Sequence, residues 1–139
     1  MIMNRTVLVT GSAKGIGKAI IEELAEKGYN TVINYLHSET EARQLQKEIS
    51  EKYDVKCLCI QTDVSDEDQV DTMIDKVEKE LGGVDILVNN AAIDLSNLFH
   101  LKNADEFRKT LDVNVVGAYN CSKRVYRHML DQEYGRIIN

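Results

Sequence analysis

Thr10-Gly11-Ser12-Ala13-Lys14-Gly15-Ile16-Gly17 decides the fold, because this glycine turn separates a short apolar run from a helical pattern. The run at residues 6–10 is rich in β-branched residues, which suits a strand buried in a parallel sheet. The pattern at residues 18–27 places apolar side chains on one face, and Gly28 follows it in the C′ position. The segment therefore predicts a strand, a tight loop and the start of a helix.

The glycine turn is also a candidate anion site. Gly11 can turn without Cβ strain, and Gly15 and Gly17 expose backbone N–H groups at a helix N-terminus. The spacing G-x-x-x-G-x-G differs from the G-x-G-x-x-G dinucleotide fingerprint and from the phosphate loop G-x-x-x-x-G-K-S/T. Because a lone glycine triplet is weak support, an ordinary strand-to-helix turn is the alternative at this point.

Length and charge restrict the class of function. The chain has 139 residues, enough for one domain with a buried core. Its formal net charge of −6 argues against a nucleic-acid or anionic-membrane surface and favours a small-molecule partner. No run approaches the roughly 20 apolar residues of a spanning helix, and the N-terminus lacks a signal-peptide pattern, so a cytoplasmic protein is expected.

The cysteines and histidines do not predict a metal site. Three cysteines form no disulfide framework, and Cys57 and Cys59 alternate along an apparent strand, so buried reduced thiols are expected. His37, His100 and His128 are scattered without the spacing of metal ligands, and each is expected on the surface or in a loop.

The rest of the chain alternates between strand and helix patterns. Further strands are expected at residues 29–35, 55–61, 84–88 and 135–139. Helices are expected at residues 39–53, 67–81 and 104–131, the first with Ser38 as its candidate N-cap. The last helix carries an apolar stripe of Phe107, Leu111, Val115, Ala118, Cys121, Val125 and Met129. The alternation predicts an α/β, Rossmann-type doubly wound parallel sheet with strand order 3-2-1-4-5.

Two turns are expected to converge on one crevice of this sheet. Ligands of doubly wound sheets bind beyond the carboxyl ends of the strands, here at the switch point between strands 1 and 4. The glycine turn follows strand 1, and Asn89-Asn90-Ala91-Ala92 follows strand 4. The crevice between these turns is therefore the candidate ligand site.

Five segments, taken in order, resemble the short-chain dehydrogenase/reductase family. The resemblance covers the whole chain and is closest to the 3-oxoacyl-[acyl-carrier-protein] reductase branch. The segments are T-G-x-x-x-G-x-G at residues 10–17, Asp63-Val64, Asn89-Asn90-Ala91-Ala92 in place of the family's N-N-A-G, Asn114 within Asp112-Val113-Asn114-Val115, and Gly135-Arg136-Ile137-Ile138-Asn139.

The resemblance implies a nicotinamide dinucleotide in the crevice. The pyrophosphate would lie against Gly11, Ile16 and Gly17 of the glycine turn. The adenine would meet Asp63 and Val64. Asp63 is equally suited to a structural role in a turn or helix cap, so both roles stay open.

The nicotinamide-side ribose would pass Asn90 and Ala91. Ala92 replaces the family's glycine and adds one methyl group beside that path, a departure we expect to be tolerated. The complete set of candidate cofactor-binding residues is Gly11, Ser12, Lys14, Gly15, Ile16, Gly17, Asn34, Asp63, Val64, Asn90, Ala91 and Ala92.

Charge at the end of strand 2 predicts NADP(H) in preference to NAD(H). NAD sites usually place an acidic residue there, about 20 residues past the glycines, to accept a hydrogen bond from the ribose 2′-OH. This chain has Asn34-Tyr35 at that point and no acid until Glu39. Lys14 could meet a 2′-phosphate, although a solvated surface lysine is the alternative.

Only part of the family's catalytic set is found. Asn114 matches its catalytic Asn, whereas the Ser after strand 5 and the Tyr-x-x-x-Lys of the next helix would fall beyond Asn139. In that set the Lys lowers the pKa of the Tyr, so that the phenol can exchange a proton with the substrate oxygen. Tyr119 and Lys123 have the same spacing but precede strand 5, so they are expected to form a helix surface.

These expectations favour the N-terminal, cofactor-binding portion of an NADP(H)-dependent carbonyl reductase or alcohol dehydrogenase, occupying residues 1–139. The sheet would be truncated after strand 5, leaving an exposed edge, and the chain alone should be inactive. The predicted substrate is a small ketone or an acyl-carrier-protein-linked 3-oxoacyl thioester, and a homo-oligomer through the long helix is expected. The alternative is a truncated, non-catalytic nucleotide-binding or assembly protein.

Overall fold

Five strands pair in parallel in the order β3-β2-β1-β4-β5, which confirms the predicted topology. The computed structural model describes residues 5–139. Leu8 of β1 is in register with Val32 of β2 and with Leu87 of β4, so the first strand lies at the centre of the sheet. The strands are β1 (Thr6–Val9), β2 (Asn30–Tyr35), β3 (Cys57–Gln61), β4 (Ile86–Val88) and β5 (Arg136–Ile138).

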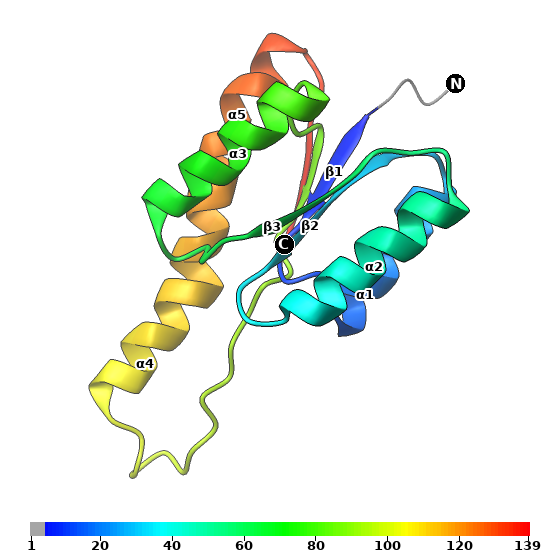
Figure 1. Cartoon of the computed structure of the whole chain (residues 1–139). Coiled ribbons are helices and arrows are strands. Elements are labelled where there is room, and N and C mark those ends of the chain that lie inside the picture. Colours follow the sequence, from blue (N-terminus) through cyan, green and yellow to red (C-terminus); the bar gives the residue numbers. More distant parts are fainter. Residues whose placement is uncertain (1–4) are drawn as a thin grey trace.

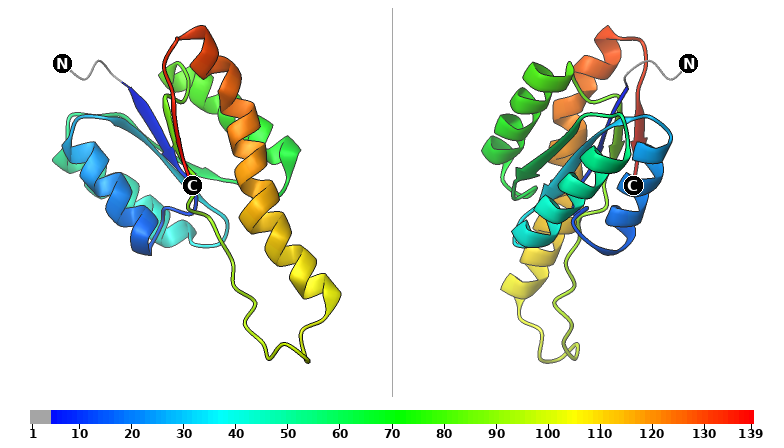
Figure 2. Two further views of the ribbon diagram at one scale, coloured as in Figure 1. Left: turned by 180° about the vertical axis from the view of Figure 1, so that it is seen from behind. Right: turned by 45° about the vertical axis from the view of Figure 1, so that its right-hand side comes forward.

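Helices cover both faces of the sheet. One face carries α1 and α2, and the other carries α3 and α5 (Figure 1 and Figure 2). Within residues 5–139, none of the helices has the length and apolar character needed to cross a membrane. The helical elements are α1 (Gly15–Glu26), α2 (Glu39–Lys52), α3 (Glu67–Leu81), α4 (Ala104–Leu111), the π-helical turn η1 (Asp112–Val116) and α5 (Gly117–Asp131).

Each face of the sheet forms its own apolar core. Val7 and Val9 pack with residues of α1 and α2, whereas Leu8 packs with residues of α3 and α5, because side chains alternate along a strand. All three are fully buried, as expected for a central parallel strand covered on both sides. This packing fixes β1 and holds the glycine turn at the carboxyl edge of the sheet.

Several boundaries differ from the sequence expectation. The first helix begins at Gly15 instead of residue 18, and β3 and β4 begin later than predicted, at Cys57 and Ile86. Ser38 precedes α2, but its side chain makes no capping hydrogen bond, because its φ of −90° and ψ of 57° depart from extended N-cap geometry. Asp66 does cap α3, since its carboxylate accepts a backbone hydrogen bond from the first turn.

The long helix at residues 104–131 is present but is interrupted by η1. α5 packs against α3 and the sheet, which buries Cys121 and Val125. α4 extends past the end of the sheet (Figure 2), so Phe107 and Leu111 are exposed, as is Val115 in η1. The apolar stripe is therefore divided into a buried half and an exposed half.

Candidate functional site

A groove of about 680 Å³ opens at the carboxyl edge of the sheet, where the predicted crevice lies. The turns after β1, β2, β3 and β4 form its walls, and residues of α4 and η1 line one side. Of the residues expected to bind the cofactor, it is lined by Gly11, Asn34, Asp63, Val64, Asn90, Ala91 and Ala92.

The glycine turn packs so closely on the turn after β4 that two of its positions exclude a side chain. Gly11 has a φ of +61°, and a Cβ there would lie 2.9 Å from the Cα of Ala91. A Cβ on Gly17 would lie 2.6 Å from Nδ2 of Asn90 and 2.7 Å from the carbonyl oxygen of Gly11. These close contacts explain why glycine occupies both positions.

Hydrogen bonds between Thr10 and the turn after β4 hold the two turns together. Thr10 Oγ1 accepts from the backbone N–H groups of Asn90 (3.0 Å) and Ala91 (2.9 Å). In return, Nδ2 of Asn90 donates to the carbonyl oxygens of Thr10 and Gly11, both at 3.0 Å. Thr10 is not among the predicted site residues, although a hydroxyl directly before the glycines was a signal available in the sequence.

The N-terminus of α1 is the exposed part of the glycine turn. Lys14 is the N-cap residue, and its side chain makes no capping hydrogen bond. The first backbone N–H groups of the helix, from Gly15 onward, therefore have no partner within the helix. Ile16 is 75% exposed, and a Cβ on Gly15 would meet nothing within 4 Å. Open N–H groups at the positive end of a helix fit an anion such as a pyrophosphate.

Ser12 and Asn34 are two buried predicted residues whose polar groups bond to each other and to neighbouring backbone. Ser12 is fully buried and exchanges hydrogen bonds with the backbone of Asn34. The side chain of Asn34 bonds to backbone groups of Gly11 and Thr62. Their placement next to the turn agrees with the prediction, but their polar atoms face protein groups.

Asp63 and Val64 lie in the turn after β3, on the groove wall nearest α3. Asp63 Oδ1 accepts from the backbone N–H (2.9 Å) and the hydroxyl (2.6 Å) of Ser65, which is the turn role anticipated as an alternative. Val64 is buried, and its carbonyl oxygen accepts from Nδ2 of the buried Asn120 at 3.0 Å. A structural role and a groove-lining position are therefore combined in Asp63.

Asn114 is carried by η1, and its side-chain amide is paired with the backbone of Ile93. Oδ1 of Asn114 accepts from the N–H of Ile93 at 2.8 Å, and Nδ2 donates to the carbonyl oxygen of Ile93 at 3.0 Å. This pair ties the segment after Ala92 to the helix at the interruption. π-helical turns are rare and occur frequently at functional sites.

Tyr119 and Lys123 lie outside the groove, on the surface of α5. Tyr119 is 61% exposed, and Nζ of Lys123 is 2.5 Å from Oε1 of Glu67 in α3. This ion pair raises the pKa of Lys123, whereas a lysine that activates a tyrosine would face that hydroxyl in the site. The position agrees with a helix-surface role for both residues.

The histidines and cysteines occupy separate places. His37 borders the groove, His100 is exposed in the loop before α4, and Nε2 of His128 is 3.3 Å from Oδ1 of Asp85. Within residues 5–139, no three His, Cys, Asp or Glu side chains are grouped as metal ligands. All three cysteines are free and buried, and burial raises the pKa of Cys57 to about 11 and that of Cys121 to about 12.

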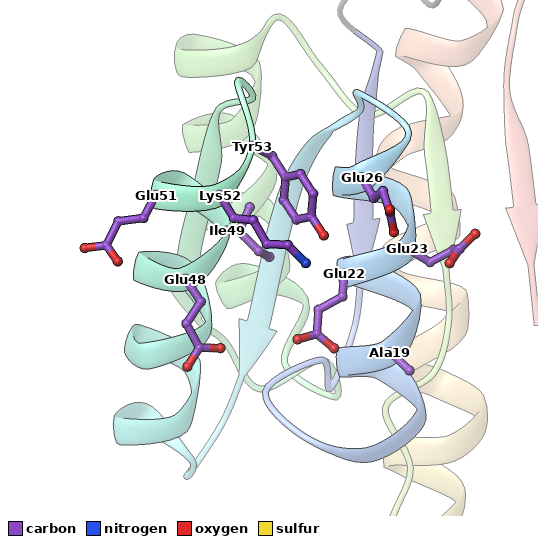
Figure 3. Close-up of a pocket in the computed structure, with 9 residues that line it drawn as sticks. All are labelled: Ala19, Glu22, Glu23, Glu26, Glu48, Ile49, Glu51, Lys52 and Tyr53. Carbon is purple, nitrogen blue, oxygen red and sulfur yellow. The ribbon is translucent and has the colours of Figure 1, made fainter.

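A second hollow, of about 770 Å³, lies between α1 and α2 (Figure 3). Five glutamates line its walls. Two of them form ion pairs with the nearby Lys18, whose Nζ is 3.8 Å from Glu22 and 3.9 Å from Glu48. None of the glycine turn lines it. Although it is the larger of the two, it is a solvated charged surface, so the groove at the carboxyl edge remains the candidate site.

Comparison with known proteins assigns the family. The family model described as short chain dehydrogenase matches residues 5–139. The chain belongs to the short chain dehydrogenase family. This agrees with the resemblance read from the five sequence segments.

Relatives within the short chain dehydrogenase family are similar over nearly the whole chain. The 3-oxoacyl-[acyl-carrier-protein] reductase FabG of Staphylococcus epidermidis is 42% identical over 137 residues, which are 99% of this chain and 56% of the relative. The chain therefore spans about half the length of the curated relatives it matches.

Two solved structures agree with the fold. A gluconate 5-dehydrogenase from Burkholderia cenocepacia, in complex with NADP and tartrate, has a TM-score of 0.86 and 35% identity, covering 97% of this chain and 52% of that one. A blue fluorescent protein from a metagenomic library, in complex with NADPH, has a TM-score of 0.89 and 33% identity, covering 97% and 54%.

Proposed function

We propose that this chain is the cofactor-binding portion of an NADP(H)-dependent oxidoreductase that acts as a 3-oxoacyl-[acyl-carrier-protein] reductase. The observation that carries the proposal is the uncapped N-terminus of α1 beside the groove between β1 and β4. Such a helix end attracts a pyrophosphate, and the groove has room for the rest of a dinucleotide. Residues 1–139 would then be one dinucleotide-binding domain of a longer fold.

The residues of the groove suit different parts of a dinucleotide. The N–H groups at Gly15, Ile16 and Gly17 would bind the pyrophosphate. The free carboxylate oxygen of Asp63 and the side chain of Val64 would face the adenine, since both line the groove on the β3 side. These contacts need no rearrangement of the turn, because its backbone is already held in place.

The turn after β4 would border the nicotinamide side. Asn90, Ala91 and Ala92 line this part of the groove, and the exposed methyl group of Ala92 leaves the neighbouring backbone accessible. When bound, the nicotinamide supplies or accepts the hydride. Asn114 would contribute to catalysis by holding Ile93, and with it this wall, through its paired amide hydrogen bonds.

NADP(H) is the preferred cofactor in this proposal. Two solved relatives contain NADP or NADPH. Strand β2 ends in Asn34 and Tyr35 without a carboxylate to accept from a ribose 2′-OH, and Lys14 supplies a positive charge at the helix N-cap.

The substrate class rests on the similarity to the staphylococcal reductase, whose name specifies a 3-oxoacyl group on an acyl carrier protein. We propose such a thioester, or a small ketone, as the hydride acceptor. The 139-residue chain by itself should bind cofactor without turnover, since Tyr119 and Lys123 lie outside the groove and no other Tyr-x-x-x-Lys occurs in the sequence.

We further propose a cytoplasmic homo-oligomer formed through the long helix. Its exposed apolar stripe would be covered by a second copy, because contiguous apolar surface of this kind commonly marks a protein interface. The exposed half of the stripe, Phe107, Leu111 and Val115, together with the exposed Tyr119 and Tyr126, would form the interface; all five are more than a third exposed.

Calorimetric titration of the purified chain with NADPH, NADH and ADP tests the proposed function. A matched pair of variants, Gly15→Asp and Gly15→Asn, isolates charge at the open helix terminus, because the two side chains have nearly the same shape and both tolerate a positive φ. We expect the aspartate variant to bind NADPH at least about tenfold more weakly than the asparagine variant.

Oxidation of NADPH by acetoacetyl thioester is measured in the same samples. Binding without turnover is expected for the 139-residue chain. Turnover by a chain of verified mass would contradict the predicted inactivity. Absence of NADPH and NADH binding at millimolar concentration would overturn the proposed function and favour an assembly protein.

A further inference from the structure

The side-chain amide of Asn34, in β2, connects the turns that follow the two neighbouring strands, β1 and β3. Asn34 lies near the end of β2 and is only 2% exposed. Its Oδ1 accepts from the backbone N–H of Gly11 at 3.0 Å, and its Nδ2 donates to the carbonyl oxygen of Thr62 at 3.2 Å. One buried amide thus joins the glycine turn after β1 to the turn after β3.

Ser12 completes this connection from the glycine turn. Its backbone N–H donates to the carbonyl oxygen of Asn34 at 2.9 Å, and its Oγ accepts from the backbone N–H of Asn34 at 3.2 Å. Ser12 is fully buried, so water does not compete for these bonds. Gly11 and Ser12 are consequently held on β2 by three hydrogen bonds, and Asn34 takes part in each.

These hydrogen bonds determine which backbone N–H groups of the glycine turn remain available to a ligand. The N–H of Gly11 is already satisfied, which leaves the open N–H groups at the start of α1 as the anion donors. Gly11 sits at a φ of +61°, one of many conformations open to glycine, so the turn needs an external contact to stay in this one. Asn34 provides one such contact from β2, beside the hydrogen bond that Asn90 Nδ2 donates to the carbonyl oxygen of Gly11.

We infer that Asn34 is a positioning residue, which pre-orders the glycine turn for a pyrophosphate and does not select the ribose 2′ substituent. The inference rests on the proposed dinucleotide binding at this groove. It assigns to Asn34 a role other than the direct cofactor contact expected from its place at the end of β2. Pre-ordering strengthens binding because less conformational entropy is lost when the ligand binds.

Positioning of the turn and selection of the ribose 2′ substituent predict different binding patterns for variants of Asn34. NADPH and NADH share the pyrophosphate and differ only at the 2′ position. A positioning residue affects both equally, whereas a ribose-selecting residue changes their ratio. Adenosine 2′-monophosphate, which has the 2′-phosphate but no pyrophosphate, separates the two parts of the ligand.

The experiment compares Asn34→Ala and the milder Asn34→Ser with wild type by calorimetric titration. We expect the Kd values for NADPH and NADH to rise by the same factor, on the order of tenfold for Asn34→Ala, because two side-chain hydrogen bonds are lost. The Kd for adenosine 2′-monophosphate should not change. A shift in the NADPH to NADH ratio, or unchanged affinities, overturns the inference.

Val32→Ala is the matched control. Val32 is fully buried in the same strand, two residues before Asn34, and it packs into the core with α3 and α5, whereas Ala13 of the glycine turn packs into the core with α1 and α2. Val32→Ala should lower the unfolding temperature while leaving all three Kd values unchanged. Loss of affinity in this variant would mean that general destabilisation explains the effect.

Amide hydrogen exchange of Gly11 in the ligand-free protein provides a readout that does not depend on binding. We expect exchange at this amide to accelerate at least about tenfold in Asn34→Ala and Asn34→Ser and to stay slow in Val32→Ala. Equal exchange in all proteins overturns the inference. If the wild type binds neither dinucleotide, the proposed function fails, while this exchange still reports on Asn34.

Discussion

Nζ of Lys14, at the N-cap of α1, lies 3.7 Å from Oε1 of Glu41 in the first turn of α2. Both side chains are at least half exposed, so the pair contributes little to folding. Its position is more informative, because a 2′-phosphate that reaches Lys14 must compete with this carboxylate. In the proposed NADPH complex, Glu41 would therefore oppose binding of the 2′-phosphate.

Neutralising either partner should change NADPH affinity in opposite directions. Glu41→Gln should tighten NADPH binding about two- to fivefold, and Lys14→Gln should weaken it by a similar or larger factor, with NADH unaffected in both. Glu39→Gln is the control, because it removes the same charge from the same helical turn but Glu39 faces Arg43. Titrations at low and high salt check this, and equal effects of Glu39→Gln and Glu41→Gln would refute a specific role for Glu41.

Gly17→Ala should destabilise the protein, although alanine is ordinarily the better helix former. A Cβ here would approach Ser12 Cα at 2.8 Å as well as Asn90 and the carbonyl of Gly11, so the turn must shift. We expect a loss of about 1–3 kcal/mol in the free energy of unfolding, measured in urea. Gly28→Ala, where the added atom meets nothing within 4 Å, should cost only about 1 kcal/mol through its φ of +87°.

Arg124 should be a strong link between α5 and α3. Its side chain is 24% exposed, and its guanidinium lies 2.5 Å from Asp75, 2.8 Å from Glu78 and 3.5 Å from Asp71. Glu78 and Asp75 raise the pKa of Arg124. Removing it leaves three carboxylates facing one another. Arg124→Met should therefore lower the free energy of unfolding by about 2 kcal/mol, less at high salt.

The control for this prediction is Arg127→Met on the same helix. Arg127 is 84% exposed and pairs with Asp131 at 3.4 Å. Urea unfolding should show a change of at most about 0.5 kcal/mol. Similar losses of unfolding free energy in the two variants would mean that the carboxylate cluster around Arg124 adds nothing to its contribution to stability.

The buried thiols should make stability fall as pH rises above 9. Burial raises the pKa of Cys57 to about 11 and that of Cys121 to about 12, from an ordinary value of 9.0. Above pH 9 the unfolded chain releases these protons first and binds fewer of them than the folded chain, so the free energy of unfolding decreases.

Each thiol should contribute a slope on the order of 1 kcal/mol per pH unit between pH 9 and its folded pKa. The variant Cys57→Ala/Cys121→Ala should show a shallower decline over this range. Between pH 7 and 8 both proteins should have parallel profiles, because the thiols are protonated in both states. If the two proteins also had parallel stability profiles above pH 9, the decline could not be attributed to the Cys57 and Cys121 thiols.

The sheet order and the meeting of the two turns were predictable from sequence, because strand and helix periodicities are local and parallel crossovers have one hand. The interruption in the long helix was not. A π-helical turn uses ordinary residues, here around Asn114, so no local pattern indicates it. Phe107 is exposed because the helix extends past the end of the sheet, and the periodicity of the helix gives no information about where the sheet ends.

The amino-acid sequence by itself determined the parallel sheet, a helix N-terminus directly after the glycine turn and the family, because each follows from residue types at short, fixed spacings. Only the tertiary structure decided the roles of Ser12, Asn34 and Asn114. Their partners are backbone groups of segments distant in sequence. A buried polar side chain bonds to the donors and acceptors that tertiary packing places within about 3 Å of it. Those groups come from several strands, turns and helices, so no local sequence pattern specifies them.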